Sequence, residues 1–276
     1  MDYLNFIHLT DLHFQGDDEE PIFGFNTVER ARMALDKIES LNLKPRFFVI
    51  TGDLANNGTV AAYRKVQIFQ EEITRRFESP VFHVLGNHDK VEGYEKAFGK
   101  PAKCINSAEI DDIALVLLSS KNGKEIFGGF NEEQMAQLEN LLKEKQDKRI
   151  LIFFHHPLAP TPHRLVDGYE FVPKWSDRFL SIISGRKNIL GVFSGHTHYD
   201  FFSNYNGIPS FVCGGTAFGI DPFPASVMRF IDAGSFLVGT IRGTKVLASP
   251  VRLPHSGREF FVFDPSKHDV SIFGLD

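Results

Sequence analysis

The chain has little cysteine and no long apolar run, and both absences narrow what it can be. Its 276 residues include only two cysteines, Cys104 and Cys213, which form no Cys-x-x-Cys pair. A disulfide scaffold or a thiolate zinc site is therefore not expected, and two reduced thiols fit the cytosol. No stretch of about 20 apolar residues is present, and the N-terminus lacks the basic and apolar segments of a signal peptide. We expect a cytoplasmic protein with no membrane partner.

The chain also lacks the positive charge that usually marks a nucleic-acid binder. Its formal net charge is −5 at pH 7, which argues against a nucleic-acid partner but leaves local basic patches open. Aromatic residues, in contrast, are plentiful. The 28 phenylalanines are interpreted as core residues rather than as a ligand platform.

Strand-like apolar runs alternate with helix-like patterns in the first two thirds of the chain, which is typical of an α/β fold. The strand-like runs cover residues 3–9, 46–50, 81–85, 113–118, 150–154 and 189–193. Helical periodicity covers 59–77, 131–145 and, more weakly, 175–184. At the start of the second helix, Asn131 and Gln134 resemble a capping box.

The last third is rich in strand-like runs without strong helices between them. Residues 201–212 predict a hairpin, because Asn206-Gly207 suits a type I′ turn. Further runs cover 227–231, 236–241 and 259–263. We expect an α/β fold with two stacked mixed β-sheets flanked by helices, a four-layer α/β/β/α sandwich.

We expect residues 1–215 to form the main body, and 216–276 to form a β-rich C-terminal extension that belongs to the same domain. The last 50 or so residues leave three options open: completing the second sheet, covering a site, or making a dimer contact.

Five polar clusters follow directly after apolar strands. They are Asp11-Leu12-His13, Gly52-Asp53, Gly86-Asn87-His88-Asp89, His155-His156-Pro157 and Gly195-His196-Thr197-His198. Loops at the carboxyl ends of strands converge in open α/β sheets, and ligands bind there. A single histidine in such a place is usually structural, whereas five clusters in series indicate one site.

The side chains in these clusters suit a particular metal chemistry. Carboxylate, imidazole and amide oxygen donors, without thiolate, favour manganese, iron or zinc. In an extended backbone Asp11 and His13 point to the same side, and His196 and His198 repeat that spacing. Asp53 could bridge two ions about 3.5–4 Å apart. Two divalent ions, two aspartates and a bound hydroxide together carry one positive charge. This charge attracts a phosphodiester, which carries one negative charge, and the hydroxide would be the nucleophile.

The ordered motifs Asp-x-His, Gly-Asp, Gly-Asn-His-Asp, His-x-Pro and Gly-His-x-His resemble the calcineurin-like metallophosphoesterase superfamily. The resemblance implies that one ion takes Asp11, His13, Asp53 and His198, and that the second takes Asp53, Asn87, His155 and His196. His155 is favoured over His156 because the family's ligand lies two residues before the proline.

By the same resemblance, His88 stabilises the transition state or protonates the leaving oxygen. Asp89 is expected to orient His88.

The flanks of the motifs resemble the bacterial class III cyclic-nucleotide phosphodiesterases, a branch that includes related glycerophosphodiesterases. The resembling segments are Asp11-Leu12-His13-Phe14, residues 52–58 and Ala62-Tyr63; Asn56 departs from the aspartate common there. The branch implies a small phosphodiester substrate such as a 3′,5′-cyclic nucleotide, and suggests a homodimer. A broad phosphomonoesterase or nuclease of the same fold is the alternative, and a non-catalytic scaffold the remote one.

Two loops are candidates for substrate contact. Residues 157–173 are Pro-rich and could form a wall or lid, with His163, Arg164 and Asp167 as polar contacts. Residues 218–223 could also approach the site, although packing is the simpler explanation for them.

Overall fold

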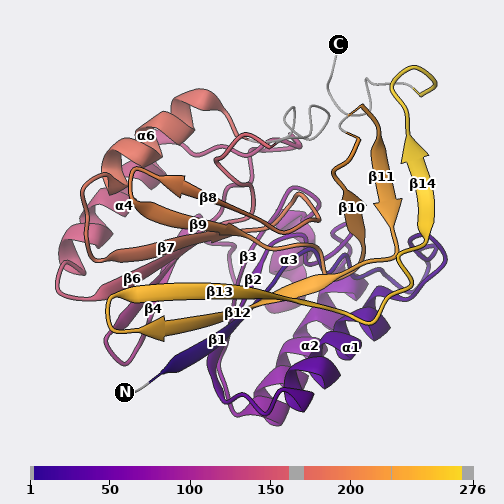
Figure 1. Cartoon of the computed structure of the whole chain (residues 1–276), viewed down its shortest axis with the longest axis horizontal. Helices are drawn as coiled ribbons and strands as arrows, with labels where there is room; N and C mark the ends of the chain where they lie inside the picture. Colours follow the sequence, from indigo (N-terminus) through magenta and orange to yellow (C-terminus); the bar gives the residue numbers. More distant parts are fainter. Residues whose placement is uncertain (1–2, 162–170, 225, 269–276) are drawn as a thin grey trace.

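The computed structural model describes residues 3–161, 171–224 and 226–268, with two mixed β-sheets at its centre (Figure 1). The first sheet has the order β13-β12-β1-β2-β3. Three strands, β1 (Leu4–Leu9), β2 (Pro45–Thr51) and β3 (Val81–Val84), run parallel. On the other side of β1, β12 (Ser235–Arg242) and β13 (Lys245–Arg252) add an antiparallel pair.

The second sheet has the order β4-β5-β6-β7-β9-β8. Its parallel centre consists of β5 (Ile113–Leu118), β6 (Arg149–Phe153), β7 (Ile189–Ser194) and β9 (Ile208–Val212). The two edges, β4 (Ile105–Ile110) and β8 (Phe201–Tyr205), are antiparallel to their neighbours.

The core between the sheets is rich in phenylalanine. Successive residues of a strand point to opposite sides, so in β1 Phe6 packs between the sheets and Ile7 packs against the outer helices. The Phe6 ring stacks on Phe47 of its own sheet at 4.9 Å and meets Phe193 of the other sheet edge-on at 5.3 Å. Each such ring contributes roughly 1.5–3 kcal/mol by its burial.

Helices cover the outer faces of both sheets. The first sheet is covered by α1 (Thr27–Ser40), α2 (Val60–Phe77) and α3 (Val91–Phe98). The second is covered by α4 (Glu132–Glu144) and α6 (Pro173–Ile183). The predicted four-layer sandwich is confirmed. Within the described residues no helix is both long and apolar enough to cross a bilayer.

The local turn and cap signals are confirmed. Asn131 Oδ1 accepts from the Gln134 backbone N–H at 2.9 Å, and Gln134 Oε1 accepts from the Asn131 N–H at 3.1 Å. Asn206 and Gly207 have φ values of 51° and 95°, as a two-residue type I′ hairpin requires.

Several elements gave no clear signal in the sequence. The buried face of α1 relies on Ala31 and Ala34 and includes the charged Arg30, so its apolar stripe is weak. α3 has only 8 residues. β13 contains Pro250, which is tolerated because the strand lies at the edge of the sheet.

The segment after residue 215 serves two purposes. β12 and β13 extend the sheet that contains β1, rather than the second sheet. β10 (Gly219–Asp221), β11 (Met228–Ile231) and β14 (Glu259–Phe263) form a small antiparallel sheet at the side of the sandwich (Figure 1).

Candidate metal centre

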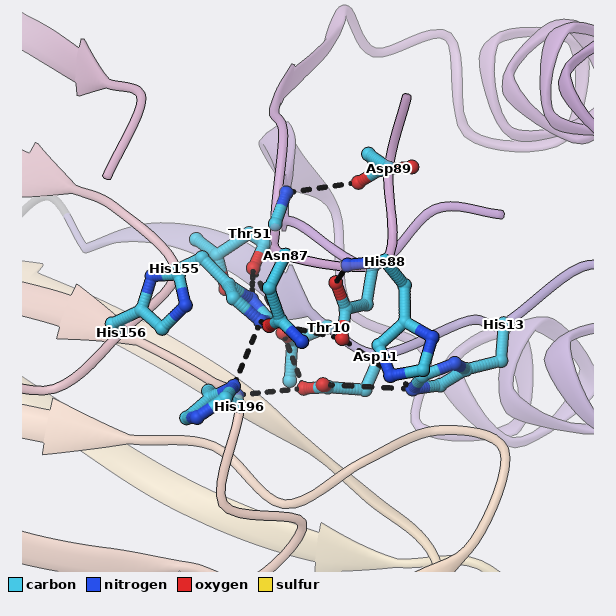
Figure 2. A network of polar contacts seen from close by, with 12 residues as sticks. Thr10, Asp11, His13, Thr51, Asn87, His88, Asp89, His155, His156 and His196 are labelled. Atoms are coloured by element: carbon cyan, nitrogen blue, oxygen red, sulfur yellow. Dashed lines mark hydrogen bonds and ion pairs between the residues drawn. The ribbon is translucent and has the colours of Figure 1, made fainter. Parts of the chain in front are cut away.

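The five predicted clusters meet at one end of the two sheets. The loops that carry them follow β1, β2, β3, β6 and β7, and their side chains point toward a common centre (Figure 2). Asp11, Asp53 and His155 are fully or almost fully buried there, whereas His88 is exposed. The structure therefore brings every predicted metal-ligating side chain to one place.

The backbone of these loops is left-handed, and the extended conformation predicted from the Asp-x-His spacing is wrong. Five donors have positive φ: Asp11 at 53°, His13 at 46°, Asp53 at 47°, His196 at 74° and His198 at 58°. Such conformations cost about 1–3 kcal/mol each in non-glycine residues and cluster at functional sites. Hydrogen bonds between loops hold them in place, including His13 N–H to the Asp53 carbonyl at 2.9 Å.

Two glycines allow the loops to approach so closely. A Cβ atom on Gly86 would lie 2.3 Å from Asp53 Oδ1, and one on Gly195 would lie 1.9 Å from Thr10 Oγ1. Any side chain at either position would displace a donor loop. The glycines of the Gly-Asn-His-Asp and Gly-His-x-His motifs are thus required by packing.

Asp11, His13 and His198 form the first donor cluster. Asp11 Oδ1 lies 3.3 Å from His198 Nε2 and 3.8 Å from His13 Nε2, and the two Nε2 atoms are 3.2 Å apart. Nδ1 of His198 lies 2.9 Å from the Phe218 carbonyl oxygen, and Nδ1 of His13 lies 3.1 Å from Asn56 Oδ1. Because these oxygens accept, each Nδ1 carries the proton and each Nε2 presents a lone pair.

This arrangement of the first cluster fits a bound metal ion. Two imidazole lone pairs and a carboxylate oxygen that face one another repel unless a cation lies between them. Asp11 Oδ1 is buried without a hydrogen-bond partner among the described residues, which is costly for a carboxylate. A divalent cation would remove both costs, and the nitrogen and oxygen donors suit manganese, iron or zinc.

Asn87, His155 and His196 form the second cluster. His155 Nε2 lies 3.1 Å from Asn87 Oδ1 and 3.2 Å from His196 Nδ1. Its Nδ1 donates to the Thr51 carbonyl oxygen at 2.6 Å. This carbonyl fixes the ring with Nε2 toward the centre, as partners of metal-bound histidines do.

Asp53 lies between the two clusters. Its Oδ2 is 3.7 Å from His13 Nε2 in the first cluster and 3.4 Å from His155 Nε2 in the second. Its Oδ1 accepts from the His88 backbone N–H at 2.9 Å, which fixes the carboxylate. The position suits a carboxylate shared by two ions.

His156 lies beside the second cluster but is held by other groups. Ser120 Oγ lies 2.8 Å from its Nδ1, and its Nε2 donates to the Ile126 carbonyl oxygen at 2.9 Å. His155, His156 and His196 could together surround an ion, yet both His156 nitrogens already have partners. His155, whose Nε2 lies 3.4 Å from Asp53 Oδ2, is the better placed of the two, and its assignment as the ligand stays a prediction.

Burial decides the pKa of two histidines in the cluster. It holds the pKa of His13 and His196 well below the ordinary value, so both are neutral and able to coordinate. For His155 the effect of burial is outweighed by Asp53 and Asp11, whose carboxylates raise its pKa to about 9. Burial would raise the pKa of Asp53, but His155 and His88 hold it well below the ordinary value. The space beside Asp53 thus favours a cation.

The prediction that Asp89 orients His88 is wrong. Asp89 accepts backbone hydrogen bonds from Leu54, Ala55 and Gly86, and a fourth from the Tyr63 hydroxyl. His88 Nδ1 lies instead 2.9 Å from the Asn56 carbonyl oxygen, and in Figure 2 the Asp89 carboxylate points away from the His88 ring. Buried Asp89 holds the Asp53 loop against the Gly86 loop, because its carboxylate accepts backbone hydrogen bonds from both loops.

A cavity of about 550 Å³ opens over both clusters. Its polar side includes His13, Asp53, Asn87, His88 and His196. Its other side is apolar and includes Phe23 and Phe230, which the sequence analysis missed because nothing distinguishes them from core phenylalanines. Phe218, within the predicted 218–223 loop, also lines it. His163, Arg164 and Asp167 lie outside the described residues.

The fold and the donor set together define a metal-dependent hydrolase with the ligands of a two-metal centre. Residues 4–200 match the calcineurin-like phosphoesterase family. The chain belongs to this family and is a metal-dependent phosphoesterase, which confirms the predicted family.

The chain is similar to several known proteins. It is 25% identical over 216 residues, covering 77% of this chain and 67% of the relative, to a cAMP/cGMP dual specificity phosphodiesterase from Mycobacterium tuberculosis. It is 28% identical over 168 residues, covering 58% and 59%, to a probable glycerophosphodiester phosphodiesterase from Arcobacter nitrofigilis. A dimetal phosphatase from Danio rerio shares the fold, with a TM-score of 0.59 and 16% identity over 89% of this chain and 98% of that one.

Proposed function

We propose that this phosphoesterase hydrolyses a small phosphodiester, with 3′,5′-cyclic nucleotides as the substrate class. The observation that carries the proposal is the pair of donor clusters sharing Asp53 at the floor of an open cavity. The similarity to a cAMP/cGMP phosphodiesterase at 25% identity supports the substrate class. When bound, two divalent ions would lower the pKa of water and neutralise charge on the phosphate.

Each ion has a proposed ligand set. Asp11, His13, Asp53 and His198 would hold the first, and Asp53, Asn87, His155 and His196 the second. These sets follow the two clusters that the distances define. Manganese, iron and zinc all suit such donors.

His88 is the proposed proton donor or transition-state stabiliser. Its ring lines the cavity and lies 4.7 Å from the His13 ring, measured between centroids. The Asn56 carbonyl oxygen holds Nδ1, so the ring has a fixed orientation at the edge of the metal site. An exposed imidazole there can reach the leaving oxygen of a bound ester.

The test compares esters at equal manganese loading. Initial rates are measured with 3′,5′-cyclic AMP, bis-p-nitrophenyl phosphate, p-nitrophenyl phosphate and single-stranded DNA. Turnover of both small diesters, well above the monoester and DNA, is expected. Turnover of the chromogenic diester alone would overturn the cyclic-nucleotide assignment, and preference for the monoester or DNA would overturn the phosphodiesterase assignment. Absence of bound metal and of any hydrolysis would favour a non-catalytic scaffold.

A further inference from the structure

One wall of the cavity over the metal centre is built from apolar side chains that neither metal ions nor a phosphate need. Its members are Ile22, Phe23, Ile126, Phe218, Ile220, Met228 and Phe230. We call the three rings Phe23, Phe218 and Phe230 the aromatic wall.

The aromatic wall begins directly on the metal-ligand residues. The Phe218 ring stacks on His198 with 4.1 Å between centroids and an interplanar angle of 15°. Phe23 meets Phe218 edge-on at 5.3 Å, and Phe230 lies 5.5 Å from Phe23. A phosphodiester seated at the metal centre therefore has this wall beside one of its ester arms.

The Phe23 side chain is only partly covered by its neighbours. Its side of the wall is supported from behind by Phe260, whose ring stacks on Phe23 at 5.5 Å, yet 37% of Phe23 remains exposed. A large exposed ring that lines a cavity is available to a ligand.

Phe23 occupies a backbone position that does not suit it. Phe23 and Gly24 are the central residues of a tight turn, with φ values of 49° and 84°, closed by the Phe25 N–H to the Ile22 carbonyl oxygen at 3.1 Å. Positive φ at both central residues is the type I′ pattern, which strongly favours Asn-Gly. The same chain uses Asn206-Gly207 with φ values of 51° and 95° in its hairpin. A bulky residue held at positive φ points to a function for its side chain.

We propose that the aromatic wall binds a planar, unsaturated substituent on one ester arm of the substrate, such as a nucleobase. The wall thereby selects such diesters over diesters of small polar alcohols. This inference rests on the proposed phosphodiesterase function. Aromatic rings stack on planar bases irrespective of base identity, and about 550 Å³ is a typical size for a small-molecule site.

Two of the three rings of the aromatic wall lie outside the part of the chain that matches the family model, and Phe23 lies within it. Phe218 and Phe230 lie beyond residues 4–200, the part that matches the calcineurin-like phosphoesterase family.

The sharpest variant is Phe23→Asn, which removes the ring and gives the turn its favoured Asn-Gly sequence. Phe23→Tyr keeps a ring, and Phe202→Asn alters another exposed phenylalanine, on β8, that does not line the cavity. For 3′,5′-cyclic AMP, Phe23→Asn is expected to lower kcat/KM about tenfold, mainly through KM. For glycerophosphoethanolamine, a diester of small polar alcohols, the change should stay within about twofold. Phe202→Asn should match the wild type, and Phe23→Tyr should lose less kcat/KM for 3′,5′-cyclic AMP than Phe23→Asn.

Stability and binding give independent readouts. The melting temperature of Phe23→Asn should stay close to that of the wild type, because the relief of turn strain offsets the loss of ring contacts with Phe218, Phe230 and Phe260. Phe230→Leu provides a second test of the wall and should show the same substrate-dependent loss. Saturation transfer from protein aromatic protons to the base of 5′-AMP should be strong in the wild type and weak in Phe23→Asn, whether or not the protein turns over a diester.

The outcomes separate the two proposals. A wild type that hydrolyses neither diester overturns the proposed function, and the saturation transfer then still decides whether the wall binds a base. The proposed role of the aromatic wall is overturned if kcat/KM falls equally for both diesters. It is also overturned if Phe23→Asn, or Phe230→Leu, leaves kcat/KM for 3′,5′-cyclic AMP unchanged.

Discussion

The floor and the wall of the cavity are built in opposite ways. The floor consists of short polar motifs after the strands, with buried donors whose orientations are fixed by carbonyl groups and by left-handed loops. The wall consists of phenylalanines from the 22–25 turn, the loop after residue 215 and β11. Chemistry at the floor depends on exact donor positions, whereas a planar group against the wall needs only a ring of suitable size.

Under the proposed function, the difference separates the residues for chemistry from those for substrate choice. The metal-ligating residues of the floor all lie within residues 4–200, the part that matches the family. Two of the three wall rings, Phe218 and Phe230, lie after residue 200. Changes at the floor should therefore remove activity for every ester, and changes at the wall should alter the choice of ester.

The largest effect is expected from Asp53→Asn. Loss of the shared carboxylate should reduce hydrolysis of every diester at least about a thousandfold, because the centre no longer holds both ions in register. Initial rates with bis-p-nitrophenyl phosphate measure it, and circular dichroism serves as the folding control. Full activity in a folded Asp53→Asn protein would exclude the shared-ligand arrangement.

His88→Ala should lower kcat about a hundredfold while metal content stays at the wild-type level. His88 contributes its ring to the cavity, and its backbone N–H, which holds Asp53, is retained in the variant. Metal analysis beside steady-state kinetics separates the two roles. Loss of metal together with activity would show that His88 is a ligand or holds one.

Substitutions of the adjacent histidines His155 and His156 should affect different properties of the protein. His155→Asn is expected to lose about one ion per chain and, with it, most of the activity. His156→Asn should keep both ions and lose about 1–3 kcal/mol of stability, because the Ser120 hydroxyl and the Ile126 carbonyl each lose their hydrogen bond to the ring. Metal analysis and urea unfolding on both variants decide between them. The reverse pattern would make His156 the ligand.

The smallest effect is expected behind the wall, from Arg30→Gln. Arg30 donates to Asp232 Oδ1 at 2.7 Å and lies 3.6 Å from the Phe25 ring centroid. Losing this largely buried pair should cost about 1–3 kcal/mol without changing metal content. Urea unfolding measures the cost; a loss of metal would contradict the separation of wall and floor.

The ion pair between Arg30 and Asp232 should also make the stability of the fold depend on pH. Burial would raise the pKa of Asp232, but hydrogen bonds from Ser256 and Arg30 lower it to about 2. The ionised carboxylate therefore stabilises the fold above its ordinary pKa, and this contribution is lost as the pH falls through about 2. Arg30→Gln should flatten that part of the acid-unfolding curve, and an unchanged curve would exclude the pair as its source.

The floor could be predicted from the sequence because its chemistry is local. Asp11, His13, Asn87, His196 and their neighbours stand in short motifs after strands, so order and residue type were sufficient. The left-handed backbone of Asp11 and His13 could not be predicted, because it depends on hydrogen bonds to a loop some 40 residues away. The partners of Asp89 were missed for the same reason.

The wall and parts of the fold lacked such signals. Phe23 and Phe230 look like core residues until tertiary packing leaves them facing a cavity. The positive φ of Phe23 runs against the preference of its residue type, so no turn rule could find it. Helix α1 was hidden by its alanine-based face and its buried Arg30.

The most direct test of the central claim is the metal stoichiometry of the full chain. After reconstitution with manganese and removal of loosely bound ions, mass spectrometry of the native protein should find two ions per chain in the wild type and fewer in Asp53→Asn. A wild type that retains no ion, or an Asp53→Asn protein that retains two, would contradict a centre built on a shared Asp53.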